Sequence, residues 1–167
     1  MAKKKAGGKL MRAALVYLKK ANSRRHRPGR LSAWSREHVF TGHIRPGAPK
    51  GSGWHYRPGG RDWPDRRIDP ASVQSNPVTG VYSARAQYFD PSVPPSGAWR
   101  GKHGNHGRSS FFPDHWTPSE VDNAITTAFH RSNPVPGFPN MWRGTYRGMT
   151  IEGYYDNGDV GHGWPVM

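Results

Sequence analysis

Residues 36–58 read Arg-Glu-His-Val-Phe-Thr-Gly-His-Ile-Arg-Pro-Gly-Ala-Pro-Lys-Gly-Ser-Gly-Trp-His-Tyr-Arg-Pro. Two segments of this stretch, residues 37–40 and 53–56, each combine a histidine with apolar neighbours, and a connection rich in proline and glycine joins them. Val39, Phe40 and Ile44 are typical of a half-buried strand, and the glycines of the connection favour turns. If the two segments lie side by side, His38 and His55 face one pocket.

Two imidazoles in one pocket suit proton transfer. Their unperturbed pKa of about 6.5 lets one take a proton from an oxygen while the other gives a proton to a second oxygen. The spacing of His38 and His55 is equally compatible with two ordinary histidines, one on a strand and one in a loop.

Further motifs accompany the histidines. Glu37-His38-Val39-Phe40-Thr41-Gly42 followed by Gly53-Trp54-His55 resembles the paired-histidine signature of the EndoU-type endoribonucleases. Trp99 to Lys102, followed by Ser109-Ser110-Phe111-Phe112-Pro113-Asp114, resembles that family's lysine and Ser-Phe-Phe segment. Residues 111–118 and 149–154 are similar to segments of the bacterial members. The resemblance spans residues 34–167.

The resemblance implies roles for particular residues. His38 and His55 would be the acid–base pair, with the choice of base and acid left open, and Lys102 would be the cation that steadies the phosphate. Arg108 lies closer than Lys102 to Ser109 and could supply that charge instead, as a fork rather than a point charge. Arg108 and Ser110 are therefore expected to contact the substrate.

The C-terminus departs from the family pattern. Where the family has a Thr-Ala-Tyr-Pro run that holds the nucleotide, this chain has His162-Gly163-Trp164-Pro165. We expect His162 to hydrogen-bond the substrate and Trp164 to stack on a base, with a place in the core as the alternative for Trp164. The change puts the family's preference for uridine in doubt.

The sequence gives less reason to expect a direct role for the remaining histidines. His43 follows His38 by five residues, so a regular strand would turn it to the opposite side. His103 and His106 lie in a loop rich in glycine and are expected to be exposed. Some relatives are stimulated by manganese, but no carboxylate cluster suggests a dedicated site. We therefore expect no cofactor and no required metal.

The net charge of +14 is concentrated at one end of the chain. Residues 1–30 hold 11 of the 25 Lys and Arg and no Asp or Glu, which leaves 14 basic and 11 acidic residues in 31–167. We therefore predict a basic arm over 1–30 and one nuclease-like domain over 31–167. Such an arm suits RNA, DNA or an anionic membrane surface. The chain has no cysteine and no apolar run long enough to span a membrane.

Local patterns favour an α+β fold with antiparallel sheets and a few helices. A short helix is expected over 10–21, after a disordered stretch over 1–9, and Pro28-Gly29 should separate it from the domain. We expect this helix to be a core or linker helix, with a membrane-surface or packaging role as the alternative. Thr117-Pro118-Ser119-Glu120 predicts a capped helix start. A strand is expected over 79–88, and residues 142–155 are expected to form a strand, a turn and a second strand. A hairpin turn at 156–159 should lead to a returning strand over 160–166.

Together these features predict an endoribonuclease that cleaves by 2′-hydroxyl transesterification and leaves 2′,3′-cyclic phosphate ends. RNA, with tRNA among the candidates, would be its substrate. The resemblance suggests a bacterial toxin that is secreted or delivered into the cytoplasm of a target cell, with an immunity protein as partner; otherwise the protein is cytoplasmic. The alternatives are a non-catalytic RNA- or DNA-binding structural protein and, less favoured, a membrane-active basic helix.

Overall fold

The computed structural model describes residues 2–45 and 47–167 of the chain. Within these residues the α-helices are α1 (Ala2–Asn22), α2 (Ala33–Phe40) and α3 (Pro118–His130). The first part of the chain also forms β1 (His43–Ile44), β2 (Gly51–Ser52), β3 (Arg66–Ile68), β4 (Gln74–Ser75), β5 (Tyr82–Asp90), β6 (Ala98–Gly101) and β7 (Arg108–Phe111). The last part forms β8 (Asn133–Val135), β9 (Phe138–Tyr146), β10 (Met149–Asp156) and β11 (Asp159–Pro165). Short 3₁₀ turns are η1 (Pro58–Gly60), η2 (Pro70–Ser72) and η3 (Asn105–Gly107).

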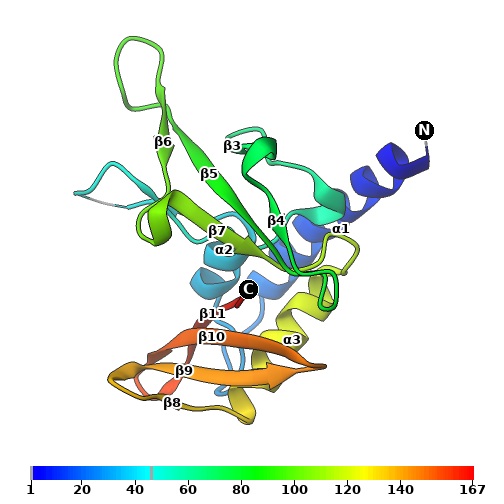
Figure 1. Ribbon diagram of the computed structural model, residues 1–167, viewed down its shortest axis with the longest axis vertical. Helices are drawn as coiled ribbons and strands as arrows, with labels where there is room; N and C mark the ends of the chain where they lie inside the picture. Colours follow the sequence, from blue (N-terminus) through cyan, green and yellow to red (C-terminus); the bar gives the residue numbers. More distant parts are fainter. Residues whose placement is uncertain (1, 46) are drawn as a thin grey trace.

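The strands build two larger antiparallel sheets and one small hairpin. In the first sheet, β5 pairs with β3, β4, β6 and β7 along different parts of its length, and the second runs in the order β11-β10-β9-β8. The hairpin is β1-β2. Figure 1 shows the two sheets at opposite ends of the view, with α2 and the C-terminus between them. The predicted α+β class with antiparallel sheets is therefore confirmed.

Helix α3 joins the second sheet to the core. Thr117 and Glu120 form the expected capping box, in which Thr117 Oγ1 accepts from the Glu120 amide at 3.2 Å and Glu120 Oε2 accepts from the Thr117 amide at 2.6 Å. The apolar stripe Val121, Ala124 and Ile125 is fully buried. The predicted hairpin at 156–159 is also present, between β10 and β11.

The N-terminal helix is longer than expected. The stretch over 1–9 was predicted to be disordered, but α1 extends back to Ala2, while Met1 and Pro46 lie outside the described residues. Ala14 and Leu18 are buried in the same core as the sheets, and the Tyr17 hydroxyl donates to the Asp122 carboxylate on α3. The division into an arm over 1–30 and a domain over 31–167 stays a prediction.

The segment that carries His38 is a helix, so the strand predicted around Val39 and Phe40 is wrong. Ser32 caps α2, because its side chain accepts from the Ser35 amide at 3.1 Å. Eight residues give too little periodicity to reveal a helix, and Val39 and Phe40 are buried at its end as they would be in a strand. Over residues 2–45 and 47–167, none of the helices combines the length and the hydropathy that a membrane span requires.

Candidate active site

The C-terminal end of α2 holds the two histidine segments together. The last carbonyls of a helix have no partner within the helix. Here the His38 carbonyl accepts from the Trp54 amide at 2.7 Å, and the Val39 carbonyl accepts from the His55 amide at 2.6 Å. The two segments therefore lie side by side, with the centres of the His38 and His55 rings 6.4 Å apart.

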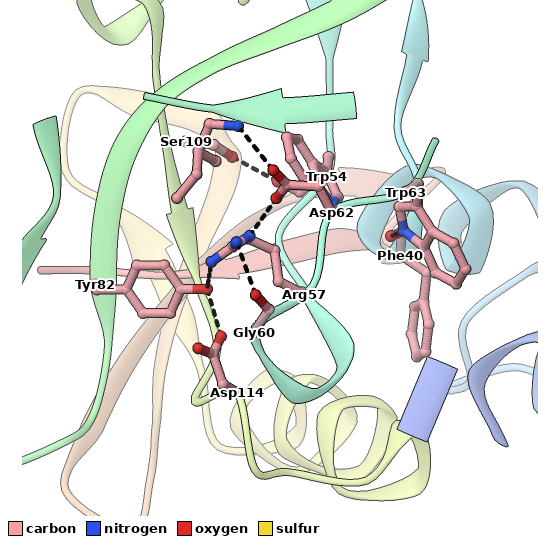
Figure 2. A network of polar contacts seen from close by, with 10 residues as sticks. Phe40, Trp54, Arg57, Gly60, Asp62, Trp63, Tyr82, Ser109 and Asp114 are labelled. Atoms are coloured by element: carbon pink, nitrogen blue, oxygen red, sulfur yellow. Dashed lines mark hydrogen bonds and ion pairs between the residues drawn. The ribbon is translucent and has the colours of Figure 1, made fainter. Parts of the chain in front are cut away.

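A polar network fixes the chain on either side of His55. Figure 2 shows the Arg57 guanidinium between the Asp62 carboxylate, at 2.7 Å, and the Tyr82 hydroxyl, at 3.1 Å. The Tyr82 hydroxyl in turn donates to Asp114. Before His55, the Ser109 hydroxyl donates to the Trp54 carbonyl at 2.6 Å. These contacts tie the His55 segment to β5 and β7 and limit its freedom to move.

The orientation and proton of His55 are set by Ser110. His55 Nδ1 lies 2.8 Å from the Ser110 carbonyl oxygen. Because a carbonyl only accepts, Nδ1 carries the proton and Nε2 is left as an acceptor. Burial lowers the pKa of His55 well below its usual value, and nearby Lys102 and His38 act in the same direction. The ring is therefore neutral at physiological pH.

His38 lies at the centre of an aromatic cluster. Its ring centre is 4.1 Å from that of His162, 5.1 Å from that of His43 and 4.8 Å from that of Trp34, on which it stacks. Burial, followed by the charges of His162, His43 and Lys102, lowers the pKa of His38 to about 2. Among the described residues, its buried Nδ1 has no hydrogen-bond partner. In the free protein the His38 ring is therefore neutral at physiological pH.

Lys102 supplies a positive charge to this cluster. Its ammonium group donates to the Gly53 carbonyl at 2.6 Å. Burial lowers the pKa of Lys102 to about 7, so the group is easily switched between its charged and neutral forms near neutral pH. Burial and then Lys102 also lower the pKa of His162 to about 4.

These side chains line a cavity of about 1010 Å³, called the histidine cavity below. All the residues singled out in the sequence line it: His38, His55, Lys102, Arg108, Ser110, His162 and Trp164. The Trp164 ring stacks over His55, with ring centres 6.1 Å apart. The Arg108 guanidinium is bound to the Ser72 and Ser83 carbonyls, at 2.7 and 3.0 Å. The Arg108 guanidinium is therefore held by backbone carbonyls, and the charge of Lys102 lowers the pKa values of His38, His55 and His162.

The sequence motifs did not indicate one residue of the histidine cavity, Trp34, and the expected position of a second, His43, was wrong. His43 was expected to face away from His38, but it lines the same cavity. The alternation of a strand does not apply here, because His38 ends a helix and His43 begins β1. Trp34, four residues before His38, also lines the cavity, although none of the motifs indicates it. Recognition of Ser32 as a cap would have placed Trp34 and His38 on one helical face.

Comparison with known proteins gives one family. The sequence model described as "Bacterial EndoU nuclease" matches residues 33–166, which is most of the chain and includes the residues of the histidine cavity that the motifs singled out. No curated protein and no solved structure matches the chain.

Within residues 2–45 and 47–167, no three His, Asp or Glu side chains are placed to share a metal ion.

Proposed function

We propose that this chain, which belongs to the bacterial EndoU nuclease family, is an endoribonuclease that cleaves RNA through the ribose 2′-hydroxyl. The observation that carries the proposal is the meeting of His38, His55 and Lys102 in one cavity. Such a reaction needs a base for the 2′-oxygen, an acid for the leaving 5′-oxygen and a cation for the charge that develops on phosphorus.

His55 is the better base. Donation from Nδ1 to the Ser110 carbonyl leaves the Nε2 lone pair available, and the neutral ring is ready to accept a proton. In the proposed step, His55 Nε2 takes the 2′-hydroxyl proton while the 2′-oxygen bonds to phosphorus. The bond from phosphorus to the 5′-oxygen then breaks, which leaves a 2′,3′-cyclic phosphate and a 5′-hydroxyl.

His38 would return a proton to the 5′-oxygen. In the free protein its pKa is about 2, mainly because of burial. A bound phosphate places a negative charge beside the ring, which favours its cationic form. Lys102 is charged below a pH of about 7 and would stabilise the phosphorane oxygens. His162, Trp164, Arg108 and Ser110 would hold the neighbouring nucleotide.

The catalysis proposed here uses side chains alone. We therefore expect cleavage in the presence of EDTA, with stimulation by manganese as the alternative outcome.

In the biological setting, we propose a toxin that is secreted or delivered into a target cell. Its substrate there would be RNA, with tRNA as one candidate, and an immunity protein would be its inhibitor.

A cleavage assay tests the proposal. The purified chain is mixed with defined RNA oligonucleotides and with tRNA, with EDTA or with manganese, and the product ends are identified. His38→Ala and His55→Ala should each lower cleavage by roughly 10²–10⁴-fold, the usual share of general acid–base catalysis. His115→Ala changes an exposed histidine outside the cavity and should leave the rate unchanged. Tight, salt-sensitive binding without cleavage would instead support a non-catalytic RNA- or DNA-binding protein.

A further inference from the structure

A second cavity, of about 790 Å³, lies where α1, α2 and α3 meet. Its basic lining consists of Arg24, Arg25, His26, Arg27, Arg30 and Arg36, and we call it the arginine cavity. Among the described residues that line it, Asp122 is the single carboxylate. The proposed catalysis uses none of these residues.

Most of this positive charge is uncompensated. Asp122 is already occupied, because its Oδ2 accepts from Arg36 Nε at 3.2 Å and from the Tyr17 hydroxyl. Arg24, Arg25, Arg27 and Arg30 are exposed, and within residues 2–45 and 47–167 their side chains form no ion pair or hydrogen bond. Four free guanidinium groups around one hollow favour a ligand with several negative charges.

The loop that carries these arginines is anchored to the domain. The Gly29 amide donates to both carboxylate oxygens of Asp159 at 3.0 Å, at the start of β11. The Arg30 amide donates to the Arg27 carbonyl at 3.2 Å, which closes a turn. The arginines are therefore presented at a defined place beside α2 and are not spread along a free tail.

Helix α2 forms a wall shared by the two cavities. Arg36 lines the arginine cavity, whereas Trp34 and His38 line the histidine cavity. With a rise of about 1.5 Å per residue, Arg36 and His38 are only about 3 Å apart along the helix axis. Trp34 is 54% exposed and stacks on His38. The exposed ring of Trp34 therefore lies on the same short helix as the wall of the arginine cavity.

We propose that the arginine cavity is a second RNA-binding site, which holds phosphates of the substrate strand that flank the cleaved bond. This inference rests on the proposed endoribonuclease function. RNA satisfies the charge of the cavity and also explains its position beside the histidine cavity, because one chain of phosphates could reach both. Arg24, Arg25, Arg27 and Arg30 would contact phosphates, and Trp34 would stack on a base between the two sites.

The test compares long and short RNA. Non-cleavable 2′-O-methyl oligonucleotides of three and twelve nucleotides are titrated into the full chain at several salt concentrations, and fluorescence anisotropy reports the Kd. One variant combines Arg24→Gln, Arg25→Gln, Arg27→Gln and Arg30→Gln. The matched control combines Lys9→Gln, Arg12→Gln, Lys19→Gln and Lys20→Gln, which removes the same charge from exposed positions of α1 outside the cavity.

The arginine variant should bind the twelve-nucleotide RNA at least tenfold more weakly and the three-nucleotide RNA as before. Each lost phosphate contact should lower the salt slope by about 0.7. The α1 control should lose much less affinity. Equal losses of affinity in the two variants, or no loss in the arginine variant, would overturn the proposal. If the arginine cavity does not bind RNA, its charge would instead suit an acidic protein as ligand.

Cleavage of a three-nucleotide RNA with a 2′-hydroxyl separates this proposal from the function on which it rests. Wild type and the arginine variant should cleave it equally. If neither cleaves any RNA while long RNA still binds through the arginines, the nuclease proposal fails and the binding site stands.

Discussion

Gly53 lies against the C-terminal end of α2 so closely that a Cβ atom on it would come within 2.1 Å of the His38 carbonyl oxygen. Its φ of +75° is also a conformation that glycine adopts at little cost. The next residue, Trp54, donates its amide to that same carbonyl. The placement of His55 next to His38 therefore requires a residue without a Cβ atom at position 53.

Gly53→Ala should strongly destabilise the protein. A non-glycine residue at positive φ costs about 1–3 kcal/mol, and the contact with the His38 carbonyl adds to this. We expect the free energy of unfolding, measured with urea, to fall by more than about 3 kcal/mol. Gly137→Ala is the matched control, because Gly137 has a φ of +79° but no described atom within 4 Å of the point that a Cβ would occupy. Equal losses in the two variants would show that the contact with α2 is unimportant.

Leu18→Ala should show whether α1 is part of the folded unit. Leu18 is 8% exposed and belongs to the core, whereas Leu15 on the same helix is 56% exposed. Leu18→Ala removes a buried side chain and should lower the free energy of unfolding by about 2 kcal/mol or more. Leu15→Ala removes a mostly exposed side chain and should change it little. Urea unfolding of the full chain measures both. An unchanged midpoint in Leu18→Ala would support an arm that folds independently of residues 31–167.

Much of the fold was predictable because the signals were local. The capping box at Thr117, the stripe after it and the hairpin at 156–159 each depend on residues close in sequence. Helix α2 was not predictable in the same way. Its cap at Ser32 is local, but its C-terminal end is held by residues 53–55, which are far from the start of the helix in the sequence.

The histidine cavity was predictable only in part. The motifs brought together His38, His55 and Lys102, but neither the stacking of Trp34 on His38 nor the position of His43 follows from them. Both depend on the helical form of residues 33–40. The arginine cavity also needed the structure, since the sequence showed a basic arm but not that part of it folds beside α2.

Trp164→Ala should weaken RNA binding. Stacking of a base on an aromatic ring contributes about 1–3 kcal/mol, so the Kd or KM should rise by about 5–150-fold. Trp164→Tyr keeps an aromatic ring and should retain most of the affinity. Trp99→Ala, on β6 outside the cavity, is the control and should bind normally. Oligonucleotides that differ in the base before the cut would show which base Trp164 and His162 accept; unchanged binding in Trp164→Ala would remove it from the site.

Lys102 should give the reaction an alkaline limb near pH 7. Burial lowers the pKa of Lys102 to about 7, so the ammonium is charged below this pH and neutral above it. His55 stays neutral over the same range, because its pKa lies well below the usual value. If the charge of Lys102 stabilises the transition state, kcat/KM should fall up to tenfold per pH unit above about 7. In Lys102→Arg the group stays charged at every accessible pH, so the limb should disappear even if the maximal rate is lower.

Lys50→Arg alters an exposed lysine outside the cavity and should keep the wild-type profile. An alkaline limb that persists in Lys102→Arg would assign this titration to another group.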